Sequence, residues 1–146
     1  MQEFKKQHLD MIENIITRMA NNSFLIKGWS ISLISAILIF ADHKNDMNFI
    51  YMLFLPNLAF WFLDSFYLQL ERKFKRLYEK VQNDYIRKTD NVALFDMNTK
   101  NIKVENIISI MFSKSELPIH FTIFLILLVI VLIAKIQIFS FICKGG

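Results

Sequence analysis

Apolar residues gather in three long runs along this chain, and polar residues lie before and between them. The runs cover residues 24–41, 49–70 and 118–143. Each is close to the roughly 20 residues that an α-helix needs to cross a bilayer. Only the short polar stretch 42–48 separates the first two runs. The pattern therefore predicts an all-α membrane protein, with a two-span helical hairpin over residues 24–70 and a third, C-terminal transmembrane helix.

Residues 1–23 have the pattern of an amphipathic helix. Apolar side chains recur there at spacings of three and four, with charged residues between them, and these are Met11, Ile12, Ile15, Ile16 and Met19. No Pro or Gly interrupts the segment, so we expect its helix to run on into the first span. The polar step from Asn21 to Ser23 is the expected place for a bend, where Ser23 would cap a new helical start.

Residues 71–117 form the predicted helix extension and connector. The second run continues into a single apolar stripe, which consists of Phe74, Leu77, Tyr78, Val81 and Tyr85. One helix from Phe49 to Lys88 is therefore expected, with the N-terminal helix packed on its extension as a stalk. The following residues are expected to form a small hairpin or an ordered loop. A short amphipathic helix over residues 105–112 is expected to bury its apolar side chains at the membrane interface, namely Ile107, Ile108, Met111 and Phe112.

The distribution of basic residues predicts the orientation of the chain. It holds 17 Lys and Arg against 13 Asp and Glu, and its mean hydropathy is +0.36. Most Lys and Arg fall in residues 1–27 and 71–118, whereas few fall in 42–48 or after 118. Cytoplasmic segments carry the excess of Lys and Arg, so the N-terminus, the helix extension and the connector are expected in the cytosol and the C-terminus outside.

Membrane topology also accounts for the positive net charge of +4, so no nucleic-acid partner is expected. The basic residues at the membrane edge form a band that is expected to contact lipid headgroups, and this band consists of Arg72, Lys73, Lys75 and Arg76.

Two ionisable residues interrupt the hairpin, Lys27 in the first run and Asp64 in the second. In an antiparallel hairpin that turns near residue 45 they fall at almost the same depth, so we expect an intramembrane charge pair. A charge at that depth costs several kcal/mol unless it is paired or hydrated. Three interpretations are open: a structural pair that sets the helix register, a lining of a hydrated path or gate, and a proton relay.

The second run carries a polar face and a helix breaker. Asn57, Trp61 and Asp64 share one side of the predicted helix and are expected to line a pore or the bundle interior. Pro56 removes one backbone hydrogen bond, so a kink is expected there.

The first run carries a stripe of small residues at four-residue spacing, Gly28, Ser32 and Ala36. Such a stripe lets another helix approach closely. Its partner is either the second helix of the same chain or a helix of a neighbouring subunit.

The search for catalytic or cofactor-binding motifs is negative. His8, His43 and His120 are far apart in the chain or on opposite sides of the predicted membrane, so no metal site is expected. The only cysteine is Cys143, and two of the three glycines are terminal, which leaves neither a Cys/His pairing nor a phosphate-binding glycine loop. We expect neither an enzyme nor a cofactor.

Four segments carry a family resemblance: Arg18-Met-Ala-Asn-Asn-Ser-Phe24, Lys27-Gly-Trp-Ser30, Trp61-x-x-Asp64 and Glu71-Arg-Lys-Phe74-x-x-Leu77-Tyr78. The pattern resembles a group of small bacterial inner-membrane proteins, and its layout is similar to the SLATT-type effectors of bacterial conflict systems. In those, a two-span hairpin precedes a cytosolic helix with a Tyr-containing stripe, and the domain is proposed to form membrane pores. The resemblance covers residues 1–88, and the third span departs from the two-span form.

The resemblance implies a homo-oligomeric effector of the bacterial inner membrane that forms a pore or disrupts the membrane, in antiphage defence. Its trigger is expected to reach the cytosolic stalk as a regulatory protein or a nucleotide signal. The alternative is a structural or scaffolding membrane protein that recruits a partner through the same stalk.

Overall fold

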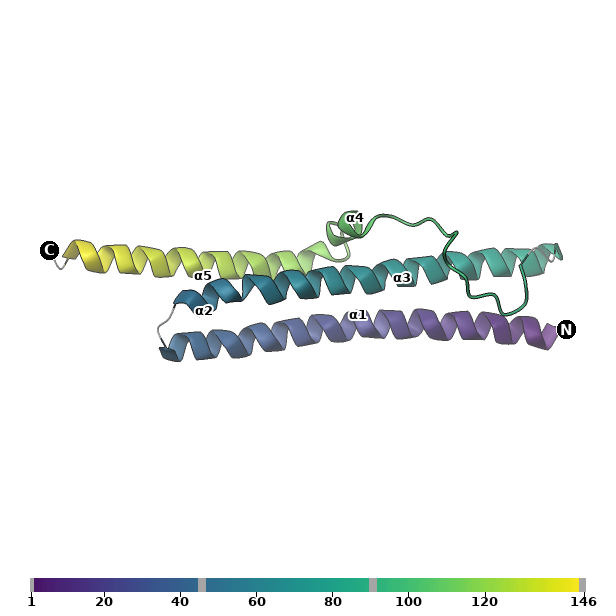
Figure 1. Cartoon of the computed structure of the whole chain (residues 1–146), viewed down its shortest axis with the longest axis horizontal. Helices are drawn as coiled ribbons and strands as arrows, with labels where there is room; N and C mark the ends of the chain where they lie inside the picture. Colours follow the sequence, from purple (N-terminus) through teal and green to yellow (C-terminus); the bar gives the residue numbers. More distant parts are fainter. Residues whose placement is uncertain (1, 45–46, 90–91, 145–146) are drawn as a thin grey trace.

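The computed structural model describes residues 2–44, 47–89 and 92–144, and the secondary structure in these ranges is helical. The helices are α1 (Gln2–Lys44), α2 (Met47–Met52), α3 (Phe54–Arg87), α4 (Ile107–Met111) and α5 (Leu117–Lys144). In Figure 1, α1 and α3 run antiparallel side by side along an elongated molecule, and α5 lies beside α2 and the first half of α3. Helices of sufficient length and apolarity to cross a membrane lie within Gln2–Phe40, Ile50–Arg87 and Leu117–Ile136.

Helix α1 is continuous from the amphipathic N-terminal segment through the first apolar run. This confirms the expected junction of the two segments, whereas the expected bend between Asn21 and Ser23 is absent. Ser23 does not cap a new helix. Its side chain is buried and donates a hydrogen bond to Asp64 on α3, whereas Asn21 is exposed, and helix α1 continues through both residues.

The second run is divided near the predicted kink at Pro56. Proline has no backbone N–H and cannot bond to the carbonyl four residues before it, that of Met52, where α2 ends. Leu53 forms a turn between α2 and α3, with its N–H on the carbonyl of Ile50 at 3.2 Å. The single helix expected from Phe49 is therefore two helices. The second of them extends to Arg87, where Lys88 takes a left-handed conformation (φ 54°) and ends it.

The predicted stalk is present at the N-terminal end of α1 and the C-terminal end of α3. Ile12, Leu77 and Val81 form its buried core, with Ile16, Phe74 and Tyr78 among the side chains packed around them. These are the contacts that the hairpin register predicts, because the antiparallel arrangement sets residues near 12–16 beside residues near 74–78.

The connector is an ordered loop in its described part and contains no strand in residues 92–106, so the alternative of a small hairpin is wrong. Apolar side chains of the loop pack on the stalk core, namely Val92, Met97 and Ile102. His8 of α1 is fully buried and attaches the loop, because its Nε2 donates to the backbone carbonyl of Asp96 at 3.2 Å. The other ring nitrogen, Nδ1, lies 2.5 Å from the Tyr85 hydroxyl.

The short amphipathic helix is present as α4, and burial of its apolar side chains at a membrane interface stays a prediction. Ile110 is fully buried against the protein, whereas Ile108 and Phe112 are about two-thirds exposed. Because α4 packs on α3, the side chain that faces α3 is the one that the fold buries.

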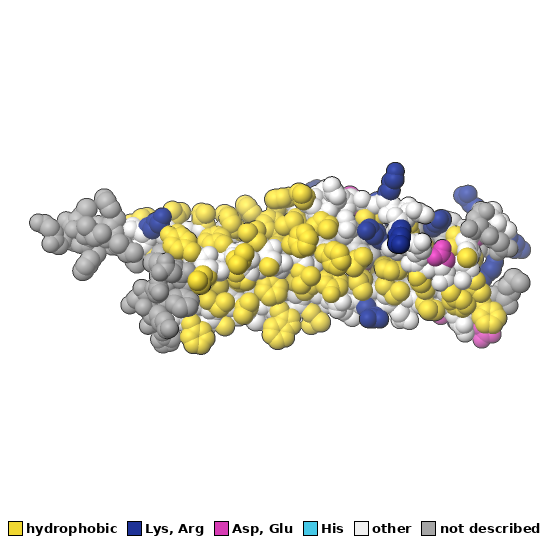
Figure 2. All heavy atoms as spheres, viewed as in Figure 1, with side chains coloured by type: hydrophobic (Ala, Val, Ile, Leu, Met, Phe, Trp, Pro, Cys, Tyr) yellow, Lys and Arg dark blue, Asp and Glu magenta, His cyan; other side chains and the backbone are white. Residues whose placement is uncertain are grey.

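The two ends of the molecule differ in surface chemistry. Figure 2 shows hydrophobic side chains over the end formed by α2, α5 and the second half of α1, while Lys and Arg side chains gather toward the stalk. A second buried core lies inside the apolar end, and we call it the apolar plug. It consists of Ile34 on α1, Leu53 between α2 and α3, and Leu127 on α5. The membrane-length helices at this end thus have apolar outer surfaces and pack aliphatic side chains between them.

Candidate functional site

Lys27 and Asp64 form the ion pair that their depth in the hairpin predicts. The Nζ atom of Lys27 lies 2.6 Å from Oδ2 of Asp64. The carboxylate is fully buried, and 18% of the lysine side chain is exposed. Ser23, one helical turn before Lys27, accepts a hydrogen bond from Nζ at 2.8 Å and donates to Oδ1 of Asp64 at 2.5 Å. The polar step in α1 therefore belongs to the site.

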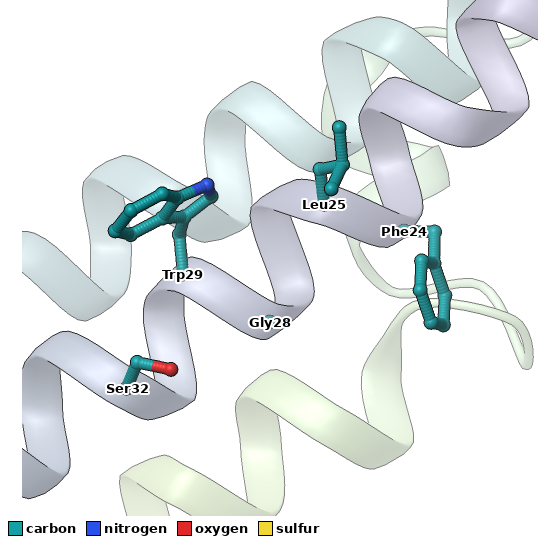
Figure 3. Close-up of a pocket in the computed structure, with 5 residues that line it drawn as sticks. All are labelled: Phe24, Leu25, Gly28, Trp29 and Ser32. Carbon is teal, nitrogen blue, oxygen red and sulfur yellow. The ribbon is translucent and has the colours of Figure 1, made fainter.

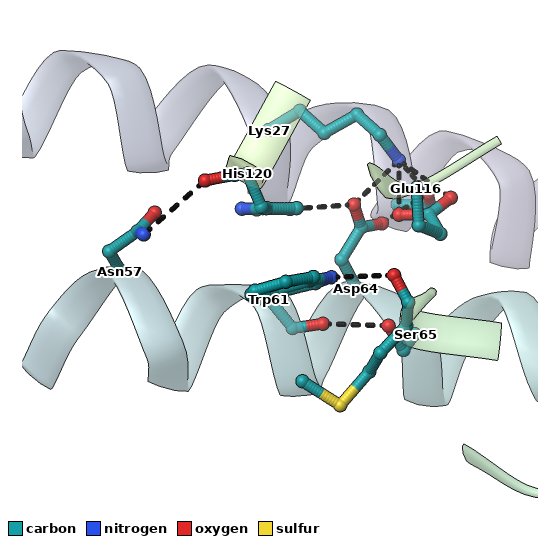
Figure 4. A network of polar contacts seen from close by, with 9 residues as sticks. Lys27, Asn57, Trp61, Asp64, Ser65, Glu116 and His120 are labelled. Carbon is teal, nitrogen blue, oxygen red and sulfur yellow. Dashed lines mark hydrogen bonds and ion pairs between the residues drawn. The ribbon is translucent and has the colours of Figure 1, made fainter. Parts of the chain in front are cut away.

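Two further ionisable residues complete the site: Glu116 lies just before α5, and His120 lies in its first turn. The Glu116 carboxylate lies beside Lys27, with Oε2 at 3.2 Å and Oε1 at 3.3 Å from Nζ. Nε2 of His120 lies 3.0 Å from Oδ2 of Asp64. Figure 4 shows these side chains converging from three separate segments. We call Lys27, Asp64, Glu116 and His120 the ionic cluster.

Helical spacing explains why these residues meet. Residues four apart on a helix share a face, which aligns Ser23 with Lys27 on α1. Glu116 directly precedes α5, and His120 lies in the first turn of that helix. Asp64 lies between the two pairs on the buried face of α3. From the sequence, no role at the hairpin charges is expected for His120, and the structure places it there. The depth of His120 is compatible with this contact, because the third span begins at the level where the second ends. Depth alone does not determine which face of the hairpin the third span packs against.

The charge of the cluster depends on Glu116, which lies just before the third span. Burial, together with the neighbouring carboxylate of Asp64, raises the pKa of Glu116 to about 7, against the opposing attraction of Lys27. When Glu116 carries a proton and His120 is neutral, the single positive charge of Lys27 balances the single negative charge of Asp64. Loss of that proton leaves two carboxylates sharing one ammonium group.

The cluster also has the composition of a metal site, which the sequence did not predict. Ligand atoms of Asp64, Glu116 and His120 all lie within 4.8 Å of one another, and the three residues are buried. Lys27 contacts both carboxylates, so its ammonium group supplies the positive charge that this pair of acids requires. The donor set by itself therefore gives no reason to add a cation.

Aromatic contacts join the cluster to the connector. Trp61 donates from Nε1 to the backbone carbonyl of Met111 in α4 at 3.0 Å. Its ring stacks on His120 with centroids 6.1 Å apart and packs edge-on against Phe112. The expected polar face of Asn57, Trp61 and Asp64 is therefore buried inside the bundle of one chain.

The small-residue stripe faces away from the rest of the chain. Gly28, Ser32 and Ala36 are exposed, and a Cβ atom added at Gly28 would meet nothing within 4 Å. Figure 3 shows Gly28 at the floor of a shallow hollow between Phe24, Trp29 and Ser32. The second helix of the same chain is thus not the partner of the stripe, while the alternative of a neighbouring subunit stays a prediction.

The basic band is partly engaged within the chain. Arg72 and Arg76 lie 3.5 and 3.6 Å from the carboxylate of Glu105 in the connector. Arg76 also donates to the backbone carbonyl of Lys103, and Lys75 pairs with Glu71 at 2.5 Å. These contacts hold the connector on α3 at the edge of the second span. Contact of the band, including Lys73, with lipid headgroups stays a prediction.

Comparison of the chain with protein-family models, with curated proteins and with solved structures finds no match. The function is therefore argued from the geometry of the ionic cluster and its surroundings.

Proposed function

We propose that this protein is a homo-oligomeric effector of the bacterial inner membrane that permeabilises the membrane under the control of its cytosolic stalk. The observation that carries the proposal is the ionic cluster, in which ionisable side chains of three membrane-spanning helices meet where the stalk ends. Such groups are costly within a membrane, and they mark functional sites by default. A purely structural register pair would need only Lys27 and Asp64.

The continuity of the helices supports control by the stalk. Helix α1 carries both the stalk residue Ile12 and the cluster residue Lys27, and α3 carries both Val81 and Asp64. A displacement between the two stalk helices is therefore transmitted to the ion pair through unbroken backbone. Because the buried pair is stable only at close distance, the cluster has two distinct arrangements, paired and separated.

The exposed stripe supports assembly of several copies. Helices in lipid associate where small residues allow close approach, and Gly28, Ser32 and Ala36 offer such a surface without disturbing contacts inside the chain. The trigger proposed from the family resemblance is a cytosolic regulatory protein or a nucleotide signal, and the proposed setting is antiphage defence.

The proposal is tested by expressing the protein in bacteria and following the membrane potential with a voltage-sensitive dye. Lys27→Gln breaks the cluster, so it should depolarise the membrane without any trigger. Adding Ala36→Leu to that variant should abolish depolarisation by blocking the stripe. The matched control is Ala59→Leu, the same change at an exposed position of α3.

An intact potential in cells with verified membrane insertion of the Lys27→Gln variant would contradict the proposal. That result favours the alternative function, a scaffold that recruits a partner through the stalk. Equal effects of Ala36→Leu and Ala59→Leu would instead contradict the role of the stripe.

A further inference from the structure

The three spans each bury a polar atom that lacks a hydrogen-bond partner among the residues that the structure describes. These atoms are Oγ of Ser30 on α1, Oδ1 of Asn57 on α3 and Nδ1 of His120 on α5. All three residues are fully buried. A buried polar group without a partner costs about 1–3 kcal/mol, so three of them in one small bundle require an explanation.

Ser30 and Asn57 lie beyond the ionic cluster, and His120 is the member of the cluster that contacts Asp64. Ser30 is three residues past Lys27, and Asn57 is seven residues before Asp64, which places both about one to two helical turns farther along the spans. Asn57 and His120 are direct neighbours, because Nδ2 of Asn57 lies 3.5 Å from the His120 carbonyl. In Figure 4 the amide of Asn57 and the imidazole nitrogen that points away from Asp64 face the same space.

The donor and acceptor types match one water molecule. Nε2 of His120 lies 3.0 Å from the carboxylate of Asp64, which only accepts hydrogen bonds. In the tautomer that places the proton on Nε2, Nδ1 is an acceptor. Oδ1 of Asn57 is also an acceptor, and the hydroxyl of Ser30 can donate. A water that gives its two protons to the acceptors and receives one from Ser30 makes the three hydrogen bonds typical of buried water.

We propose that Ser30, Asn57 and His120 form a binding site for water inside the membrane-spanning bundle. The apolar plug of Ile34, Leu53 and Leu127 begins at the depth of Asn57, because Ile34 is seven residues past Lys27. Its side chains offer no polar partner, so the hydrated region ends there. The site is then a closed, hydrated vestibule that opens only when the plug separates. The water site stands independently, and only its role as a vestibule rests on the function proposed above.

Water-edited solid-state NMR on the full protein in liposomes tests the site directly. Magnetisation passes from water protons to nearby nuclei, and the side-chain amide of Asn57 is observed after ¹⁵N labelling of asparagine. We expect its signal, identified by its loss in Asn57→Asp, to build up several-fold faster than the methyl signals of Leu127. Equal, slow build-up at both residues would overturn the water site.

A stability measurement gives an independent check. Ser30→Ala removes a single oxygen. If no water is bound, the substitution removes the free-energy cost of an unsatisfied buried hydroxyl; if water is bound, it deletes a hydrogen bond. We expect the Tm in detergent to fall by about 2–4 °C. Ser35→Ala, at an exposed position of the same helix, is the control and should leave it unchanged. An unchanged or higher Tm of Ser30→Ala removes Ser30 from the site.

Neither measurement involves permeability, so the two proposals fail separately. A dry pocket would leave the depolarisation by Lys27→Gln unaffected, and an intact potential would leave the hydration of Asn57 unaffected.

Discussion

Lys27 contacts two buried carboxylates, those of Asp64 and Glu116. This arrangement differs from the simple pair that the sequence predicts, and it changes which substitution is the most damaging. Removing Asp64 leaves Lys27 paired with Glu116. Removing Lys27 leaves Asp64 and Glu116 together without the ammonium group, and an uncompensated buried charge is more costly than a lost pair.

Lys27→Gln should therefore lower the free energy of unfolding by about 3–5 kcal/mol, the range for breaking a buried ion pair, and Asp64→Asn should lower it by less. The double variant Lys27→Gln/Asp64→Asn should be more stable than Lys27→Gln alone, because it no longer contains the Asp64 carboxylate that has lost its ammonium partner. Thermal unfolding in detergent measures all three. Equal losses in the two single variants would show that Glu116 does not share the lysine.

Glu116 should make the stability depend on pH. Its pKa is raised to about 7 by burial and by Asp64, from an ordinary value of 4.5. The folded protein therefore binds an extra proton between these values, so the stabilisation from this group is complete below pH 4.5 and is lost as the pH rises through 7. Glu116→Gln should reduce the fall in Tm between pH 5 and pH 8.

The matched control for this experiment is Glu79→Gln, at an exposed position of the stalk. It should keep the pH dependence of the unsubstituted protein. A Glu116→Gln variant with the same slope as that protein would assign the pH dependence to another group of the cluster.

At the scale of the elements, α1 and α3 each extend through both the stalk and the spans. The connector loop packs on the stalk core. The stalk core is small, so its few buried side chains carry most of its apolar stabilisation. His8 and Arg76 attach the loop by contacts to the backbone carbonyls of Asp96 and Lys103, which are independent of the loop's own side chains.

Leu77→Ala should open the stalk without unfolding the spans. Leu77 is 2% exposed, and truncating a buried leucine costs about 2–5 kcal/mol. We expect faster amide hydrogen exchange in residues 2–20 and 72–87, with little change in the spans. Ile86→Ala is the control, because Ile86 is 71% exposed. Uniformly faster exchange along the whole of α1 would show that stalk and spans unfold as one unit.

At the scale of the whole molecule, the asymmetric distribution of Lys and Arg predicts that the stalk is cytosolic and the C-terminus outside. The chain has a single cysteine, Cys143, near its C-terminus, so the native protein carries one label site. A membrane-impermeant thiol reagent should label Cys143 from outside intact cells. Asn98→Cys in a Cys143→Ser background should be labelled only after lysis, and the reverse pattern would invert the proposed topology.

Local patterns predicted most of the elements. The length of the apolar runs predicted the three membrane-length helices, and the register of the hairpin predicted that Ile12 and Ile16 lie beside Phe74 and Tyr78. Pro56 predicted a kink in the second run, and the helix is interrupted at Leu53, three residues before that proline. These features follow from backbone geometry and from the cost of leaving apolar side chains and peptide groups unsatisfied, which act along the chain itself.

The ion pair of Lys27 and Asp64 was also accessible from the sequence, because an antiparallel hairpin with a short turn determines which residues share a depth. The addition of Glu116 and His120 was not, since it depends on how the third span packs against the hairpin after a long connector. The face of α4 that is buried and the outward direction of the Gly28 stripe depend on the same packing. Hydrophobicity alone decides that helices enter a membrane, but side-chain contacts between them decide which faces meet.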